Sequence, residues 1–162
     1  MPRFLVIAAA LLSSAFLLWA GQSLPENVAS HFNSEGVADG TMPRPWFMVV
    51  MLTVVSVMPP VVWLLQARHS RLCRTRIAHP EYWYDERRRA DTVATLEAHA
   101  AVLMLALSAF LCFVFWLLVQ AHRTGGPAPV LDKPLFLLGL GVFVVFATGW
   151  VVLLKLRFRK RG

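Results

Sequence analysis

The four longest apolar runs of this sequence contain no aspartate, glutamate, lysine or arginine. A run of about 18 or more such residues is long enough to cross a hydrocarbon core of about 30 Å as a helix. Four of them in a chain of 162 residues leave too little polar sequence to cover them in water, so they predict a membrane protein. The absence of charge inside them also weighs against an ion-coupled carrier, which usually needs intramembrane ionisable groups. The predicted spans are residues 4–21, 46–66, 100–119 and 135–154.

These spans predict an all-α integral membrane protein with four transmembrane helices in a single membrane domain, residues 1–162. An external loop at 22–45 and a cytoplasmic loop at 67–99 are its two long polar segments. Met1–Gly21 also resembles a signal peptide. We favour an uncleaved first span, because its apolar stretch is long and Leu18 interrupts the small-residue cleavage pattern.

Acidic residues are scarce, nine against sixteen lysines and arginines, and the basic ones are unevenly placed. With the N-terminus inside, thirteen of the sixteen fall on the cytoplasmic side, as the positive-inside rule requires. The charge therefore predicts a multi-pass membrane protein with both termini in the cytoplasm. The lipid bilayer is then the partner that explains the charge, and we expect no nucleic acid.

Only two cysteines are present, Cys73 in the predicted cytoplasmic loop and Cys112 in the middle of the third span. They lie at different depths, and the cytoplasm is reducing, so we expect no disulfide.

The external loop holds the most specific polar sequence. Ser23 and Glu26 fit a helical capping box, which predicts one or two helical turns as far as Ala29 or Ser30. Gly36 and Gly40 then end any regular element. The second external loop, Gln120–Pro134, is short and is expected to be irregular.

The candidate site residues of this loop lie within nine positions. Three uses remain open for them: a structural role, recognition of a ligand or partner, and metal binding or acid–base catalysis. In the structural interpretation, which the sequence favours, His31 and Asn33 hydrogen-bond the loop's own backbone while Gly36 and Gly40 supply positive φ. No metal-binding, nucleophile or phosphate-loop motif accompanies them, so we expect no enzyme, no catalytic residue, no metal and no cofactor. The candidates are His31, Asn33, Glu35, Gly36 and Asp39.

Pro59 and Pro60 interrupt the second span and leave carbonyl groups near Val55 and Ser56 without helical donors. We expect the hydroxyl of Thr53 or Ser56 to serve them. A structural kink is the simpler interpretation, and a gating hinge is the alternative.

The cytoplasmic loop carries an aromatic run followed by arginines, typical of a segment that lies at the membrane interface. A helix is predicted from Glu86 onward, continuing into the third span because no glycine or proline intervenes. The candidate docking or interface residues here are Tyr82, Trp83, Arg87 and Arg88.

Two blocks of this sequence form a recognisable pattern. The first is Leu24-Pro25, His31-Phe32-Asn33, Gly36 and Asp39-Gly40, and the second is Pro80-Glu81-Tyr82-Trp83 with Glu86-Arg87-Arg88. Together they resemble a bacterial membrane-protein family, that of domain of unknown function 1648, which is related to the N-terminal part of larger Sdp-toxin immunity proteins. Those proteins protect the membrane and signal by holding a repressor there. The resemblance implies the membrane fold, a place in the bacterial cytoplasmic (inner) membrane and, more distantly, an immunity-like or signalling role.

The sequence thus predicts a small membrane protein that acts as a binding, sensory or immunity-like module through its external loop. A peptide or another membrane protein is the expected partner, and a homo-oligomer remains open. The alternative is a subunit of a transporter or channel complex.

Overall fold

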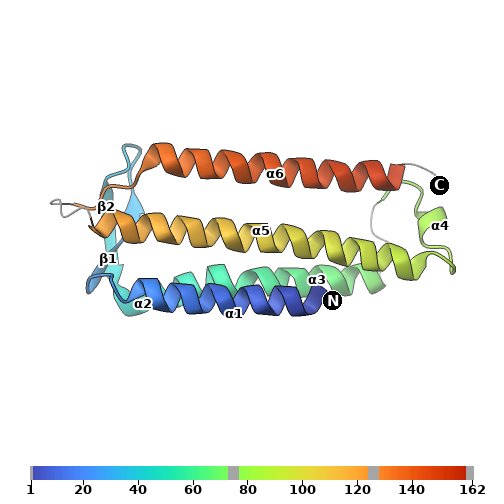
Figure 1. The fold of residues 1–162 in the computed structure, drawn as a ribbon, viewed down its shortest axis with the longest axis horizontal. Helices are drawn as coiled ribbons and strands as arrows, with labels where there is room; N and C mark the ends of the chain where they lie inside the picture. The colour runs from blue at the N-terminus through green and yellow to red at the C-terminus, as the bar shows by residue number, and fades with distance from the viewer. Residues whose placement is uncertain (1, 73–76, 124–127, 160–162) are drawn as a thin grey trace.

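The computed structural model describes residues 2–72, 77–123 and 128–159. Within them, four long helices run side by side along one axis, with a β-hairpin at one end and a short helix at the other (Figure 1). The helices and strands are α1 (Pro2–Gly21), β1 (Asn27–Phe32), β2 (Ala38–Pro43), α2 (Arg44–Leu52), η1 (Thr53–Val57), α3 (Met58–Leu72), α4 (Pro80–Trp83), α5 (Arg89–Arg123) and α6 (Lys133–Arg159). Below, the hairpin end is the end that carries β1 and β2, and the basic end is the one that carries α4 and the chain termini.

Four helices are long and apolar enough to cross a membrane: α1, the continuous α2–η1–α3, α5 and α6. This confirms the predicted fold class. The helices extend beyond the predicted spans, and α5, with 35 residues, is about 50 Å long at the usual rise. It exceeds a hydrocarbon core of about 30 Å, so its ends project beyond the core.

The helix predicted from Glu86 does continue into the third span, but it begins at Arg89. The carbonyl of Asp85 accepts the N–H groups of both Arg88 and Arg89, closing a turn between α4 and α5. Residues 85–88 are therefore used in this turn, and the regular helix starts after it.

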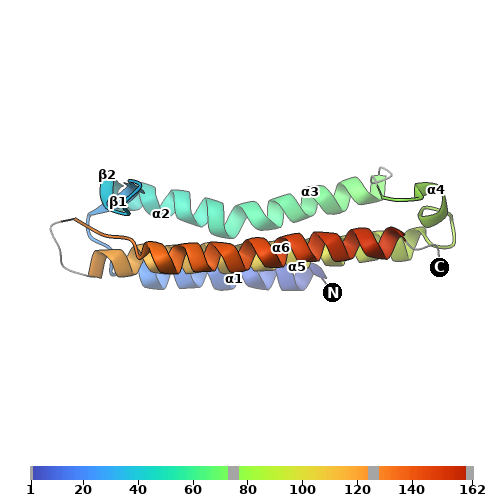
Figure 2. The ribbon, with the colours of Figure 1, turned by 90° about the horizontal axis from the view of Figure 1, so that it is seen from above.

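The second span contains a single wide turn, η1, between α2 and α3. The N–H of Met58 donates to the carbonyl of Thr53, five residues back. The turn immediately precedes Pro59 and Pro60, whose missing N–H groups prevent regular pairing there. Figure 2 shows that the α2–α3 path is bent near its middle and lies alongside the other helices.

The prediction that a Thr53 or Ser56 hydroxyl serves the carbonyl groups near Val55 and Ser56 is wrong. The Thr53 hydroxyl donates to the carbonyl of Val49, one turn earlier, at 2.8 Å. The Ser56 hydroxyl is buried and has no hydrogen-bond partner within the described ranges. The wider π-turn, rather than a side chain, accommodates the two prolines.

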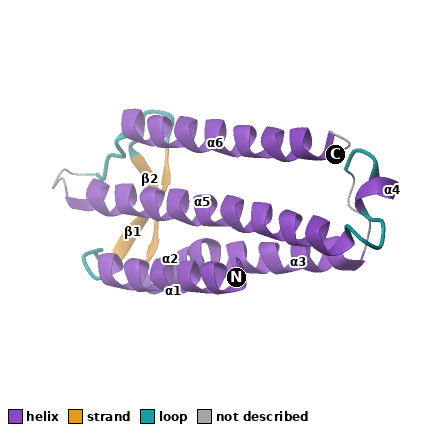
Figure 3. Ribbon diagram, turned by 45° about the vertical axis from the view of Figure 1, so that its right-hand side comes forward, coloured by secondary structure: helices purple, strands orange, loops and turns teal. Residues whose placement is uncertain are grey.

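The predicted helical turns after Ser23 are also wrong, because an antiparallel β-hairpin occupies this segment (Figure 3). Val28 pairs with Met42 and Ala29 with Thr41. The Ser23 hydroxyl donates to the carbonyl of Ala20 at the end of α1, so it does not cap a following helix. Strand pairing satisfies part of the backbone of Asn27–Phe32, and Val28 and Ala29 are buried against the helices.

Apolar cores lie at both ends of the bundle. The core at the hairpin end joins α1, α2 and α5 to the hairpin through Leu17, Phe47, Phe115, Leu24 and Val28. At the basic end, α1, α3 and α5 enclose a second core. By contrast, α6 packs mainly on α5, and its apolar window has no buried residue. Lipid would cover the large apolar side chains that it exposes.

Candidate functional site

Asn33 builds the turn of the β1–β2 hairpin. Its side-chain Oδ1 accepts the backbone N–H of Glu35 at 2.9 Å and that of Val37 at 3.0 Å. Gly36 follows with a φ of 86°, a conformation that favours glycine. The structural interpretation is therefore confirmed for Asn33 and Gly36: an asparagine-closed turn with a left-handed glycine.

His31 and Asp39 form an exposed pair across the two strands. Nδ1 of His31 lies 2.5 Å from Oδ1 of Asp39, and the two side chains are 73% and 44% exposed. The prediction that His31 bonds the loop backbone is wrong, since its recorded partner is this carboxylate. Gly40 also lacks the predicted positive φ. It lies opposite His31 in the register, where an added Cβ would come within 3.1 Å of the His31 Cβ.

The chemistry available at this pair is limited. Glu35 contributes its backbone N–H to the Asn33 turn. No group of three or more histidines, cysteines, aspartates or glutamates that could hold a metal ion occurs in residues 2–72, 77–123 and 128–159. The pair offers an imidazole and a carboxylate on an open surface, which suits hydrogen bonding to a partner better than a water-excluded reaction.

His122, near the end of α5, holds the hairpin to the bundle. The buried N–H of Ala29 donates to Nε2 of His122 at 3.0 Å, and Nδ1 of His122 lies 2.7 Å from the carbonyl of Leu118. A carbonyl can only accept, so Nδ1 carries the proton and Nε2 is free to accept. His122 could not be identified from the sequence, because no local pattern connects it with Ala29, 93 residues away.

The tip of the hairpin is fixed by the segment before α6. Ala38 donates its N–H to the carbonyl of Pro129, and Leu131 donates to that of Gly36. Nζ of Lys133 donates to the carbonyl of Ser34 at 2.8 Å. The expected irregular second external loop is thus partly an extended segment joined to the hairpin, with a bridge between Val37 and Val130. The remaining part of that prediction, Gly125-Gly126-Pro127, lies outside the described residues, as does Cys73.

At the basic end, Trp83 is a packing residue. Its indole N–H donates to the carbonyl of Phe158 at 3.0 Å, and the two rings meet edge to face at 5.2 Å. Its carbonyl accepts the hydroxyl of Thr92 at 2.8 Å. Trp83 therefore joins α4 to both α5 and α6.

The other candidates of this segment are more accessible. The guanidinium of Arg88 lies 4.0 Å from the centre of the Tyr82 ring and 3.8 Å from the carboxylate of Asp85. Arg87 and Arg88 are exposed, and Tyr82 is half-buried. They form a charged and aromatic surface beside the Trp83 contact.

Comparison with known proteins supports the identification made from the loop sequence. The model of the family described as domain of unknown function (DUF1648) matches residues 8–57, which comprise most of α1, the hairpin, α2 and η1. No curated protein and no solved structure gave a significant match. The chain is therefore a membrane protein whose residues 8–57 are similar to the DUF1648 family.

Proposed function

We propose that this protein is a binding or sensory module whose β1–β2 hairpin recognises a peptide or a membrane-protein partner outside the membrane. The observation that carries the proposal is the exposed His31–Asp39 pair on a hairpin that is fixed to the helices. Following the charge distribution, the hairpin lies outside the membrane and both termini lie in the cytoplasm. The family resemblance implies that this membrane is a bacterial inner membrane. The immunity-like role implied by the family resemblance is one form of this function.

The anchoring of the hairpin supports recognition over a passive cap. Val28 and Ala29 of the hairpin are buried, and His122 and Lys133 hold it by hydrogen bonds. Polar groups that are already held in place lose less conformational freedom on binding, so more of their interaction energy is available as affinity. An isolated two-stranded hairpin is marginal in water, and these contacts supply the stability that it lacks.

Helix α5 connects the hairpin with the opposite side of the membrane. His122 lies near one end of α5 and Thr92 near the other, where Thr92 contacts Trp83. A partner bound to the hairpin would therefore be connected, through α5, with α4 and with the neighbouring residues Tyr82, Arg87 and Arg88. This basic-end surface is the proposed docking site for a cytoplasmic component.

The test replaces the pair without disturbing the turn. With a photo-crosslinking residue at position 35, the otherwise unchanged chain should give an adduct of one discrete mass in its native membrane. His31→Gln and Asp39→Asn should each reduce this adduct about tenfold, since hydrogen bonds to charged groups contribute about 1.5–3 kcal/mol. Glu26→Gln removes an exposed carboxylate elsewhere on the same segment and is the matched control.

Membrane levels separate recognition from folding. The His31 and Asp39 variants should reach the same level as the unchanged chain, whereas Asn33→Ala should lower it, because Asn33 closes the turn. Adducts that persist in both pair variants, or that fall equally with Glu26→Gln, would contradict recognition by the pair.

A subunit of a transporter or channel complex is the second candidate, and η1 is the observation that favours it. The buried Ser56 hydroxyl in this turn lacks a partner within the described ranges, so it is a polar group that a path through the bundle would use. Reconstituted oligomer should then pass potassium, chloride or protons in liposomes, and Ser56→Ala should change that flux more than Thr53→Ala does. Sealed liposomes with no flux of any of these ions would count against this function.

A further inference from the structure

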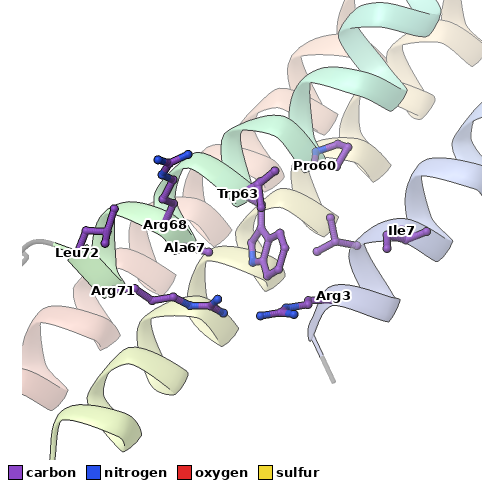
Figure 4. A pocket seen from close by; sticks show the side chains of 10 residues that line it. Arg3, Ile7, Pro60, Trp63, Ala67, Arg68, Arg71 and Leu72 are labelled. Atoms are coloured by element: carbon purple, nitrogen blue, oxygen red, sulfur yellow. The ribbon is translucent and has the colours of Figure 1, made fainter.

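A cavity of about 640 Å³ opens between α1 and α3 at the basic end of the bundle. Figure 4 shows that the guanidinium groups of Arg3 and Arg71 point toward each other from the two helices, with the Trp63 indole beside them. The Arg68 side chain extends along the outer side of α3. The cavity thus combines basic groups at its mouth with an apolar wall. The lining residues on that wall include Val6, Ile7, Pro60 and Leu64.

Arg71 and Trp63, which line this cavity, are both held in place by Glu97 of α5. Nε of Arg71 lies 2.5 Å from Oε1 of Glu97, whose side chain is only 9% exposed. The indole N–H of Trp63 donates to the backbone carbonyl of Glu97 at 3.1 Å. Glu97 on α5 therefore orients both residues, while the terminal nitrogens of Arg71 remain available on the side of Arg3 (Figure 4).

The charges around the cavity do not balance. Three arginines line it, and the carboxylate of Glu97 offsets only one of them. A further guanidinium, that of Arg89, donates to the carbonyl of Arg71 at 2.9 Å. Like charges near an apolar wall repel strongly because the local dielectric is low, so the arrangement favours an anion between Arg3 and Arg71. Guanidinium groups match phosphate oxygens in geometry as well as in charge.

The apolar wall of the cavity favours an anion that carries a hydrocarbon chain. Below the guanidinium groups the lining is hydrocarbon, and this part of the cavity lies between two helices that cross the membrane. A small soluble anion would leave that wall empty, whereas a phospholipid would fill it with an acyl chain. Basic pockets between transmembrane helices are known to bind anionic headgroups.

We propose that the cavity between α1 and α3 is a binding site for one anionic phospholipid of the adjacent leaflet. The phosphodiester lies between Arg3 and Arg71, Arg68 contacts the headgroup from outside, and one acyl chain lies along Val6, Pro60 and Leu64. The lipid would hold α1 against α3 at the end of the bundle where these helices carry like charges. This site is independent of the hairpin and of any partner there.

The test measures lipid retained by the purified protein. The full chain is equilibrated in vesicles of phosphatidylcholine with phosphatidylglycerol, extracted in mild detergent, and its bound lipid is counted by mass spectrometry. The unchanged chain should retain about one phosphatidylglycerol, as expected for a single pocket, in preference to phosphatidylcholine. Arg3→Gln should lower this occupancy about fivefold, and Arg3→Gln with Arg68→Gln should lower it further.

The matched control removes the same number of charges outside the cavity. Lys155→Gln with Arg159→Gln changes two exposed basic residues of α6 at the same end of the bundle and should leave retention unchanged. An equal loss in this control would show diffuse attraction to the leaflet and would overturn the site. Competition by inorganic phosphate or glycerophosphate would assign the arginines to a soluble anion instead.

A second measurement uses the unchanged chain, so it does not depend on how well the variants fold. A photoactivatable phosphatidylglycerol should label peptides that contain residues 3–7 and 60–72, and unlabelled phosphatidylglycerol should compete. Labelling spread equally over α5 and α6 at this end would contradict a defined site.

Discussion

Replacing Phe115 by alanine should lower the free energy of unfolding by about 3–5 kcal/mol, as expected for a fully buried aromatic side chain. Phe115 is 0% exposed, and its ring lies 6.2 Å from that of Phe16 and 6.3 Å from that of Phe47. It therefore joins α5 to α1 and α2 directly below the hairpin. The measurement is equilibrium unfolding in detergent micelles, followed by tryptophan fluorescence.

The same substitution at Phe110 is the control for this prediction. Phe110 lies on the same helix, but it is only half-buried and stacks on Phe143 of α6 with ring centres 4.9 Å apart. Since α6 packs at the edge of the bundle, Phe110→Ala should cost less than half as much. Equal losses at the two positions would contradict a core centred on Phe115.

Replacing His122 by alanine should release the hairpin from the helices. The N–H of Ala29, a residue only 1% exposed, would lose its acceptor. A buried donor left unpaired costs about 1–3 kcal/mol. Hydrogen exchange at this amide should therefore accelerate by roughly 5- to 150-fold, since each 1.4 kcal/mol is a factor of ten. Hydrogen-exchange mass spectrometry of the peptide that spans β1 measures the change.

His31→Ala provides the comparison for His122. It removes an imidazole from the same hairpin, but an exposed one whose partner is the side chain of Asp39. Exposed ion pairs contribute about 0–1 kcal/mol, so exchange at Ala29 should change little. If His122→Ala left the Ala29 exchange rate unchanged, another group would have to satisfy that amide.

The positions of the four spans could be predicted well from the sequence, and the residues at which the helices begin less well. Uncharged runs located all four spans, because a chain cannot place charge in hydrocarbon without a large cost. The helix from the cytoplasmic loop into the third span also followed from the absence of glycine and proline. Its start at Arg89 did not, since it depends on the turn around the Asp85 carbonyl.

The external segment shows the limit of local patterns. Ser23 and Glu26 fit a helix start, but the Ser23 hydroxyl donates to the carbonyl of Ala20 at the end of α1. The segment that follows pairs as a strand, in which Val28 and Ala29 are buried. A capping box is a local preference worth about 1 kcal/mol, and burial of a hairpin face against the bundle outweighs it. Asn33 and Gly36 were predicted correctly because their roles are local.

The sequence by itself determined that this protein crosses a membrane four times, that its basic residues gather at one end, and that Leu24–Gly40 carries a family pattern. These properties depend on composition and short-range order, which can be observed without a fold. Only the tertiary structure decided that His31 meets Asp39, that His122 holds Ala29, and that Arg3 and Arg71 line one cavity beside Trp63. The last two arrangements join residues far apart in the chain, and the first depends on strand register, so each follows from how the elements pack and not from any local preference.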